Sequence, residues 1–552
     1  MSGPGRGRLQ TPGPYFLLVG LVLVATGRAL GNGFAFDDVP MIAENAQIQT
    51  LAAPWTYAQQ SYWPPKNLGD AYRPWTVWWL AIQWAIGEGA PVIFHLGNLL
   101  LTLAATLLVY RLLLELLPPL GAIVGAAIFA VHPVHVEATA NVVGQGELWV
   151  AIFVTAAILH YLRARRRGNF SSRDRLALAA LYLLAAASKE QGIVLPGLLL
   201  AIEWCLPRAA VAGPKRWDRQ LVPVYGLLAV VGIGFLAGRY AVLGDLGGGP
   251  PAAGLESLGL AQRGLVMLPL VTDWARLLVW PRDLLAQYSP PAFGLPAGFG
   301  PRAWLGGLIV VGAVAALFAR RRAPVLALGT AWIGLAILPV SNVLFPTGIL
   351  IAERTLFLAT IGIALLAGGF CGWVARRPPW LPAAVVATVG AIGAGAARSW
   401  SRQAVWRDSP TLFAQTIADE PRSYRGYVVR AKELMRRGDP DEAIRMYQLA
   451  ADLYRGDPRV FEEWGQLHRA ANHCDRAIPI FAGGIDRHPT ATVLRSRLFE
   501  CLLAVGDTTG AVAVADAGLK LGMTEFTSSL ARATKGRAAP SDRPAASPRT
   551  DR

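Results

Sequence analysis

Long apolar runs separated by short polar segments fill the first 400 residues of the chain. They lie at 15–30, 92–115, 119–132, 147–162, 176–188, 191–206, 221–240, 303–319, 324–340, 350–374 and 380–397. About 20 apolar residues cross a bilayer as a helix, so we expect eleven membrane spans. The first run reads either as a secretory signal or as a retained anchor. No small-x-small cleavage site follows it cleanly, which favours an anchor preceded by a cytoplasmic segment, residues 1–14.

Two further apolar stretches, 75–86 and 265–280, are expected to lie along the membrane surface or dip into it. The first is rich in tryptophan, and the second contains Asp273. Both features are typical of interfacial helices. If neither stretch spans, the eleven remaining runs have a consistent alternation of direction.

Clusters of basic residues predict which loops face the cytoplasm. They are Arg163, Arg165, Arg166, Arg167, Arg173 and Arg175; Arg208, Lys215, Arg216 and Arg219; Arg320, Arg321 and Arg322; and Arg376 with Arg377. The positive-inside rule places all four clusters in the cytoplasm. The large loop 32–91 and everything after residue 398 then face outward.

Composition agrees with a membrane protein. Hydrophobic residues make up 53% of the chain and charged residues only 16%, which excludes an ordinary soluble enzyme and a disordered chain. The net charge of +16 lies in short clusters between apolar runs, so it fits membrane topology better than nucleic-acid binding. Charge becomes denser after residue 400, which marks a domain boundary there. No Gly-x-x-x-x-Gly-Lys-Ser/Thr phosphate loop is present, which disfavours an ATP-driven transporter.

A repeat follows the membrane part. Ala443, Ala477 and Ala511 stand 34 residues apart. A 34-residue helix–turn–helix period predicts tetratricopeptide repeats over 401–530, about three and a half units, whose concave surface suits recognition of a peptide or protein. A stability cap is the alternative role. Residues 531–552 have no period and are expected to be disordered.

The four cysteines are too few for a disulfide framework. Cys205 and Cys371 lie in apolar runs and are expected to pack there. Cys474 and Cys501 lie in the repeats, where a disulfide requires an oxidising compartment. Their spacing alone does not decide whether they pair.

Asp37 and Asp38 follow the first apolar run at its outer end. Adjacent carboxylates beside an apolar wall repel each other and lose solvation, so one of them is expected to have a raised pKa, suited to taking a proton from a hydroxyl. A divalent metal held by the pair is an alternative, and so is a simple solvated loop start.

His132, His135 and Glu137 lie close together between two apolar runs. Their spacing does not match the i, i+4 zinc pair of His-Glu-x-x-His, and Pro133 breaks a helix there. A zinc hydrolase is therefore disfavoured. If these residues are functional, they bind a phosphate or sugar hydroxyls. The alternative is that they only cap the end of a helix.

Lys189 and Glu190 end another outward-running helix, and Glu353 and Arg354 follow the segment Phe345 to Gly348 at the outward start of the run 350–374. An outward-facing Arg and Lys at the membrane surface suit a lipid-linked phosphate. A single Arg at a helix end can also simply reach the interface. Convergence of acids, histidines and cations from several segments on one face favours a site.

With these motifs in order, the chain resembles the C superfamily of polytopic membrane glycosyltransferases (GT-C), and specifically the transmembrane and tetratricopeptide-repeat O-mannosyltransferases and their bacterial relatives. The matching segments are Phe36-Asp37-Asp38 with Asn45, Tyr72-Arg73-Pro74, His95 with Asn98, Phe129 to Ala138, Lys189-Glu190 with Pro196, Ser341-Asn342, Phe345 to Gly348, and Ala352-Glu353-Arg354. The resemblance covers about residues 15 to 525. It implies an all-α fold, a transmembrane helix bundle with interfacial helices followed by a short α-solenoid.

The resemblance also implies a chemistry. A sugar, mannose-like, passes with inversion from a lipid-phosphate donor to an acceptor hydroxyl at the outer face, and an acid of the first outer loop is the base. By position that base is Asp37 or Asp38, with Asp37 slightly preferred. Arg354, Lys189 and Arg73 then bind the donor phosphate, and His132, His135, Glu137, Glu190 and Glu353 bind or orient substrates. The Ala, Gly and Arg bias suggests a bacterial inner membrane and a polyprenyl phosphate carrier.

Two other classes compete with this interpretation. A non-catalytic anchor that displays the repeats as an assembly scaffold explains the repeats but not the many spans, since one span would suffice. A flippase or polymerase of lipid-linked sugars predicts polar residues through the membrane depth rather than at one face.

Overall fold

The computed structural model describes residues 12–64, 71–207, 219–246, 251–252, 254–255, 258–293 and 299–528. Helices make up the regular structure of these residues, and the only β-bridge found among them joins Pro291 to Ser423. The all-α class is confirmed. Most of the expected cytoplasmic segment 1–14, the tail 531–552, and the basic residues Arg208, Lys215 and Arg216 lie outside the described residues.

The chain divides into two compact units. The first is Met1–Tyr288 with Phe293–Glu420, and the second is Ser289–Ala292 with Pro421–Arg552. Helix α18 (Ser409–Asp419), which we counted with the repeats, falls in the first unit. The domain boundary at residue 401 stays a prediction.

The first half of the first unit is a series of long helices joined by short helical turns. They are α1 (Gly13–Thr26), η1 (Gly27–Gly31), η2 (Val39–Ala43), α2 (Pro54–Tyr57), α3 (Pro74–Gly87), α4 (Pro91–Leu116), α5 (Pro119–Ala130), η3 (Pro133–His135), α6 (Val136–Ala140), η4 (Val142–Gly144), α7 (Gln145–Arg167), α8 (Ser172–Ser188), η5 (Glu190–Val194) and α9 (Leu195–Cys205).

The rest of the first unit continues this pattern. Its helices are α11 (Leu221–Leu243), α12 (Leu260–Val266), α13 (Leu268–Val279), α14 (Pro301–Phe318), η6 (Ala319–Arg321), α15 (Pro324–Ile337), η7 (Leu338–Val340), η8 (Glu353–Leu356), α16 (Thr360–Val374), η9 (Pro378–Trp380), α17 (Leu381–Gln403), η10 (Ala404–Trp406) and α18.

Six helical segments among the described residues are long and apolar enough to cross a membrane. They are Gly13–Gly31, Pro91–Leu116, Val142–Arg167, Leu221–Leu243, Pro301–Arg321 and Pro378–Trp406. A pair bent by 44°, Pro119–Ala130 with Pro133–Ala140, makes up to seven. The eleven spans stay a prediction. Helix α3, at 14 residues, rises about 21 Å, which is less than the ~30 Å of a hydrocarbon core.

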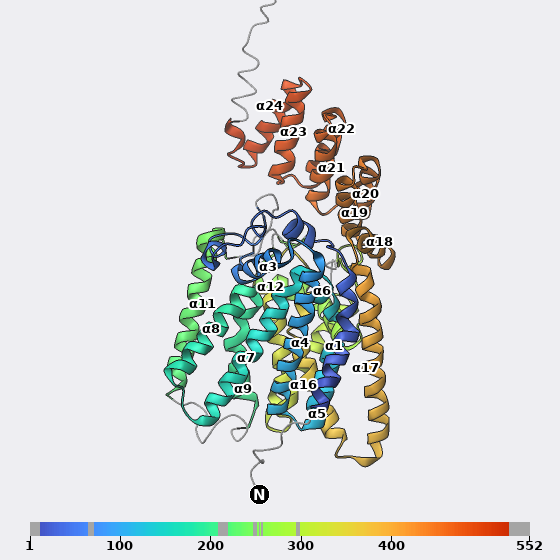
Figure 1. Cartoon of the computed structure of the whole chain (residues 1–552). Helices are drawn as coiled ribbons and strands as arrows, with labels where there is room; N and C mark the ends of the chain where they lie inside the picture. Colours follow the sequence, from blue (N-terminus) through green and yellow to red (C-terminus); the bar gives the residue numbers. More distant parts are fainter. Residues whose placement is uncertain are drawn as a thin grey trace, which may run out of the picture. The chain divides into compact units, whose positions relative to one another are not determined.

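Helices α1, α4, α5, α7 and α16 run side by side through the first unit (Figure 1). Helices α5 and α16 pack closely, because glycines line their crossing. A Cβ atom built on Gly121 would lie 2.4 Å from the carbonyl oxygen of Gly368, and one on Gly368 would lie 2.3 Å from that of Gly121. Small residues are what let apolar helices pack backbone to backbone in a membrane.

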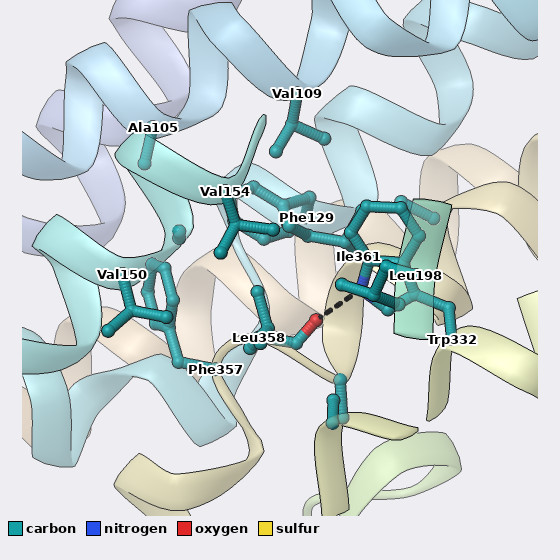
Figure 2. Packing of buried hydrophobic residues seen from close by; sticks show 14 of the residues in the cluster. Ala105, Val109, Phe129, Val150, Val154, Leu198, Trp332, Phe357, Leu358 and Ile361 are labelled. Atoms are coloured by element: carbon teal, nitrogen blue, oxygen red, sulfur yellow. Dashed lines mark hydrogen bonds between the residues drawn. The ribbon is translucent and has the colours of Figure 1, made fainter. Parts of the chain in front are cut away.

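The core between these helices is apolar, and the buried indole N–H of Trp332 in this core has a hydrogen-bond partner. Figure 2 shows Phe129, Val154 and Ile361 packed around Trp332, whose Nε1 donates a hydrogen bond of 2.9 Å to the carbonyl oxygen of Leu358. A buried tryptophan N–H needs such a partner. This packing fixes the ends of α5, α7 and α16, from which the candidate site is built.

The second unit is a run of helix pairs. Its helices are α19 (Tyr424–Arg436), α20 (Pro440–Leu453), α21 (Pro458–Ala470), α22 (Cys474–Arg487), α23 (Thr492–Ala504) and α24 (Thr508–Lys520). The three alanines of the 34-residue period are fully buried. A Cβ on Gly465 would lie 2.3 Å from the ring of Phe481, so the small residue admits that ring. Cys474 and Cys501 form a disulfide between α22 and α23.

Candidate functional site

Arg354 lies at the centre of a group of carboxylates in the first unit. Its Nη1 is 3.2 Å from an oxygen of Asp37 and 3.1 Å from one of Glu137, and its Nε is 3.8 Å from Glu147. Its backbone N–H also donates to Glu137, at 2.9 Å. Burial acts to lower the pKa of Arg354, but the three carboxylates outweigh burial and raise this pKa. The guanidinium is therefore held charged.

A second set of ion pairs continues from this group. Lys189 pairs with Glu147, while Arg73 and Arg239 pair with Glu190 at 3.0 and 3.3 Å. Burial acts to raise the pKa of Glu190, but the two arginines hold it down, at about 2. With the Arg354 group, four cations face four carboxylates, so this charge network is internally balanced. We call these eight residues the charge network.

Two side chains outside the charge network fix the segments that carry it. The hydroxyl of Thr76, on α3, donates to the carbonyl oxygen of Ser188 at 2.8 Å, which holds the start of α3 beside the Lys189 turn. The amide of Gln191 donates to the carbonyl oxygens of Ala336 and Thr355 at 3.0 and 2.8 Å. These bonds tie together the short breaks between apolar helices, where backbone groups need partners.

The two adjacent aspartates turn to different partners. Phe36, just before them, has a φ of 55°, a left-handed conformation that costs a non-glycine residue about 1 kcal/mol or more. Asp37 then faces Arg354, whereas Asp38 is fully buried and accepts hydrogen bonds from the backbone of Val142 and Val143 at 3.1 and 2.9 Å. The two carboxylates thus have different partners, and a divalent metal held by the pair stays a prediction.

Asp38 has the raised pKa that the sequence predicted for one of the pair. Burial raises it from 3.8 to about 7, against the lowering effect of its backbone hydrogen bonds, and Asp37 contributes least. The main cause is thus loss of solvation rather than repulsion. The oxygens of Asp38 accept hydrogen bonds from the first two residues of the helical segment Val142–Arg167, so this side chain stabilises the start of that segment.

The hydrogen bonds found for the ring nitrogens of His132 and His135 go to groups outside the charge network. Nδ1 of His132 accepts from the backbone N–H of Val134 at 3.3 Å, and its Nε2 lies 3.0 Å from the carbonyl oxygen of Leu278. Nε2 of His135 lies 2.8 Å from the hydroxyl of Thr360. His132 thus has the contacts of the helix-end cap named above, and Glu137 alone of that motif reaches Arg354.

Glu353 also has other partners. Its carboxylate accepts from the backbone N–H of Leu285 and from the hydroxyl of Tyr288, the latter at 2.7 Å. Burial raises the pKa of Glu353 to about 8. These contacts hold the loop after α13, and a substrate-binding role for Glu353 stays a prediction.

Sequence reasoning missed three residues that the structure adds. Glu147 and Arg239 belong to the charge network, and Tyr62 lies against Arg73, whose guanidinium is 4.7 Å from the ring centroid. Glu147 and Arg239 are charged residues inside apolar runs, a signal that by itself points to function. Tyr62 carries no such signal.

The charge network is built from pairs of cations and carboxylates. Within the described ranges, no group of three or more His, Cys, Asp or Glu side chains is placed to hold a metal ion. Asp37, Glu137 and Glu147 instead surround the guanidinium of Arg354. A guanidinium and an ammonium together suit the oxygens of a phosphate.

Comparison with solved structures gives distant likenesses. The apo oligosaccharyltransferase of Archaeoglobus fulgidus is 13% identical, covers 72% of this chain and 57% of its own, and has a TM-score of 0.42. ArnT of Cupriavidus metallidurans, bound to undecaprenyl phosphate, is 13% identical, covers 92% of this chain and 80% of its own, and has a TM-score of 0.36.

Comparison of sequences gives stronger matches, although no protein-family model matches the chain. "Protein O-mannosyl-transferase TMTC3" of Homo sapiens is 25% identical over 445 residues, covering 73% of this chain and 47% of the relative. "Protein O-mannosyl-transferase TMTC4" of Mus musculus is 27% identical over 490 residues, covering 78% and 65%. "Protein O-mannosyl-transferase F38B6.6" of Caenorhabditis elegans is 25% identical over 461 residues, covering 81% and 64%.

The chain spans about half to two thirds of the length of these curated relatives. The similarity covers most of this chain. Together with the apolar helices, it indicates a multi-pass membrane protein. The chain resembles the TMTC protein O-mannosyl-transferases.

Proposed function

We propose that this protein is a membrane glycosyltransferase that moves a sugar, mannose-like, from a polyprenyl-phosphate donor to an acceptor hydroxyl at the extracytoplasmic face. The observation that carries the proposal is the buried charge network, in which Arg354 pairs with Asp37 and Lys189 pairs with Glu147. The similarity to named O-mannosyl-transferases supports the same reaction class.

The donor phosphate binds where carboxylates now neutralise the cations. Arg354 and Lys189 receive its oxygens, and Arg73 adds a third positive charge nearby. Glu137 and Glu147 are positioning residues, because they fix the Arg354 guanidinium through 3.1 and 3.8 Å contacts. Glu190 does the same for Arg73. Cations that are already held in position stabilise the charge that develops on a leaving phosphate, because the site does not have to reorganise during the reaction.

Asp37 is the general base. Its carboxylate takes the proton of the acceptor hydroxyl as that oxygen forms a bond to the anomeric carbon. The bond between this carbon and the phosphate oxygen breaks, and its electron pair stays on the polyprenyl phosphate, so the configuration inverts. Asp38 is unsuited to this role, because its oxygens are buried against the backbone of Val142 and Val143.

The orientation of the chain follows from the basic clusters. We place the N-terminus in the cytoplasm, eleven spans in a bacterial inner membrane, and the charge network and the second unit outside. The helix pairs of the second unit are tetratricopeptide repeats that bind an acceptor protein or peptide. The disulfide between Cys474 and Cys501 supports an oxidising location for this unit.

A transfer assay tests the proposal. Purified protein in detergent is given a panel of polyprenyl-phosphate sugars, and release of the lipid phosphate is measured with and without EDTA. Asp37→Asn should lower release by about 100-fold or more, as loss of a general base does. The matched control is Asp273→Asn, which removes a carboxylate paired with Arg302 outside the charge network. No release from any donor by folded protein would leave the scaffold interpretation.

A further inference from the structure

Tyr62 is a buried residue of the long loop between η1 and α3. Its side chain is 1% exposed, and its backbone N–H donates to the carbonyl oxygen of Ala71 at 2.8 Å. Its ring packs edge-on against Trp63, with centroids 5.4 Å apart, and the guanidinium of Arg73 lies over it. The ring is thus fixed in place at the edge of the charge network.

The hydroxyl of Tyr62 has no hydrogen-bond partner in the part of the chain that the structure describes. Buried tyrosine hydroxyls usually find one, because leaving a buried donor unsatisfied costs free energy. An unsatisfied polar group in a native protein therefore calls for an explanation, and a missing ligand is one of the few available.

The charges that act on this hydroxyl come from both parts of the charge network. They belong to Arg73, Asp37, Glu147 and Arg354. Burial raises the pKa of Tyr62 above its ordinary value, and the two carboxylates add to this effect, so the group stays a neutral O–H donor. Its natural partner is an acceptor oxygen that enters beside the charge network.

We propose that the hydroxyl of Tyr62 donates a hydrogen bond to a phosphate oxygen of the lipid-phosphate donor. This inference rests on the proposed function and adds a substrate-binding residue to it. The carboxylates of the charge network are already paired with cations, so an incoming phosphate supplies the acceptor that the hydroxyl lacks. The bond adds directional binding to the attraction of Arg354 and Lys189.

The substitution Tyr62→Phe isolates the hydroxyl, because the ring and its contacts remain. Tyr57→Phe is the matched control from the same loop. The hydroxyl of Tyr57 donates to the carbonyl oxygen of Thr50 and accepts from the backbone N–H of Ala52, both at 3.1 Å. Removal of a satisfied hydroxyl should lower the melting temperature, whereas removal of an unsatisfied one should leave it unchanged or raise it.

The experiment measures thermal stability without ligand and the affinity for farnesyl phosphate in detergent, with farnesol as the probe that lacks phosphate. We expect Tyr62→Phe to keep or raise the melting temperature and to bind farnesyl phosphate about 5- to 20-fold more weakly, with farnesol unaffected. Tyr57→Phe should lose stability and keep its affinity.

Two results overturn the inference while leaving the proposed function intact. One is unchanged affinity of Tyr62→Phe for farnesyl phosphate when the native protein binds it. The other is a lowered melting temperature or failure to fold, which would give the hydroxyl a structural role. Native protein that is folded and does not bind farnesyl phosphate would contradict both this inference and the proposed function.

Discussion

If the donor phosphate binds Arg354 as proposed, it competes with Asp37 for the same guanidinium. In the ligand-free protein Asp37 lies 3.2 Å from Nη1 of Arg354, so a phosphate must displace this carboxylate before it can make the same contact. We therefore expect Asp37→Asn to bind a polyprenyl phosphate more tightly than the native protein, although it transfers sugar more slowly. Binding of the donor would then release the base for the acceptor hydroxyl.

The magnitude follows from the geometry of the pair. At 3.2 Å and an effective dielectric constant of about 20, two unit charges attract by about 5 kcal/mol. The side chains of Arg354 and Asp37 are 15% and 14% exposed, so water screens part of this energy. Hydrogen bonds to charged groups contribute about 1.5–3 kcal/mol net. With Glu137 and Glu147 still present, we expect a gain of about 1–2 kcal/mol, or roughly 5- to 30-fold.

The assay titrates farnesyl phosphate into native protein, Asp37→Asn and the control Asp273→Asn, all in the same detergent. Transfer is measured on the same preparations. The expected pattern is tighter binding with slower transfer for Asp37→Asn and no change in either for the control. Equal or weaker binding by Asp37→Asn would refute the competition and would leave Arg354 free for phosphate without displacement.

Three further predictions concern stability. Burial raises the pKa of Asp38 from 3.8 to about 7, so the folded state binds its proton more tightly than the unfolded state does. This contribution to stability is full below about pH 4 and is lost as pH rises towards 7. In Asp38→Asn the melting temperature should therefore fall less over that range than in the native protein. Parallel curves of melting temperature against pH for the two proteins would contradict the raised pKa of Asp38. Gly121→Val should prevent close packing of α5 on α16 and lower detergent-solubilised yield and melting temperature sharply, whereas Gly312→Val, where no atom lies within 4 Å of a built Cβ, should not. Cys501→Ser removes the disulfide and should destabilise the second unit by about 3–4 kcal/mol in the chain-entropy model, because Cys474 and Cys501 are 27 residues apart in sequence. Labelling of these two thiols in the oxidised native protein would disprove the pairing.

The sequence by itself determined much of the architecture. Hydrophobic runs specify helices because apolar side chains must leave water, and their length relates directly to bilayer thickness. The 34-residue spacing places Ala443, Ala477 and Ala511 at equivalent positions, and all three are buried in the structure. Motif order also pointed to Asp37, Lys189 and Arg354 as residues of one site, although each lies on a different segment.

Tertiary structure decided how these residues are paired. Asp37 and Arg354 are 317 residues apart, so no local pattern could show that they meet. The backbone at Phe36 separates Asp37 from Asp38, and it assigns the raised pKa to the acid that serves the backbone rather than to the one beside Arg354. Tyr62 could be recognised as a candidate only from its neighbours, because the hydrogen bonding of a buried group depends on the atoms that replace water around it.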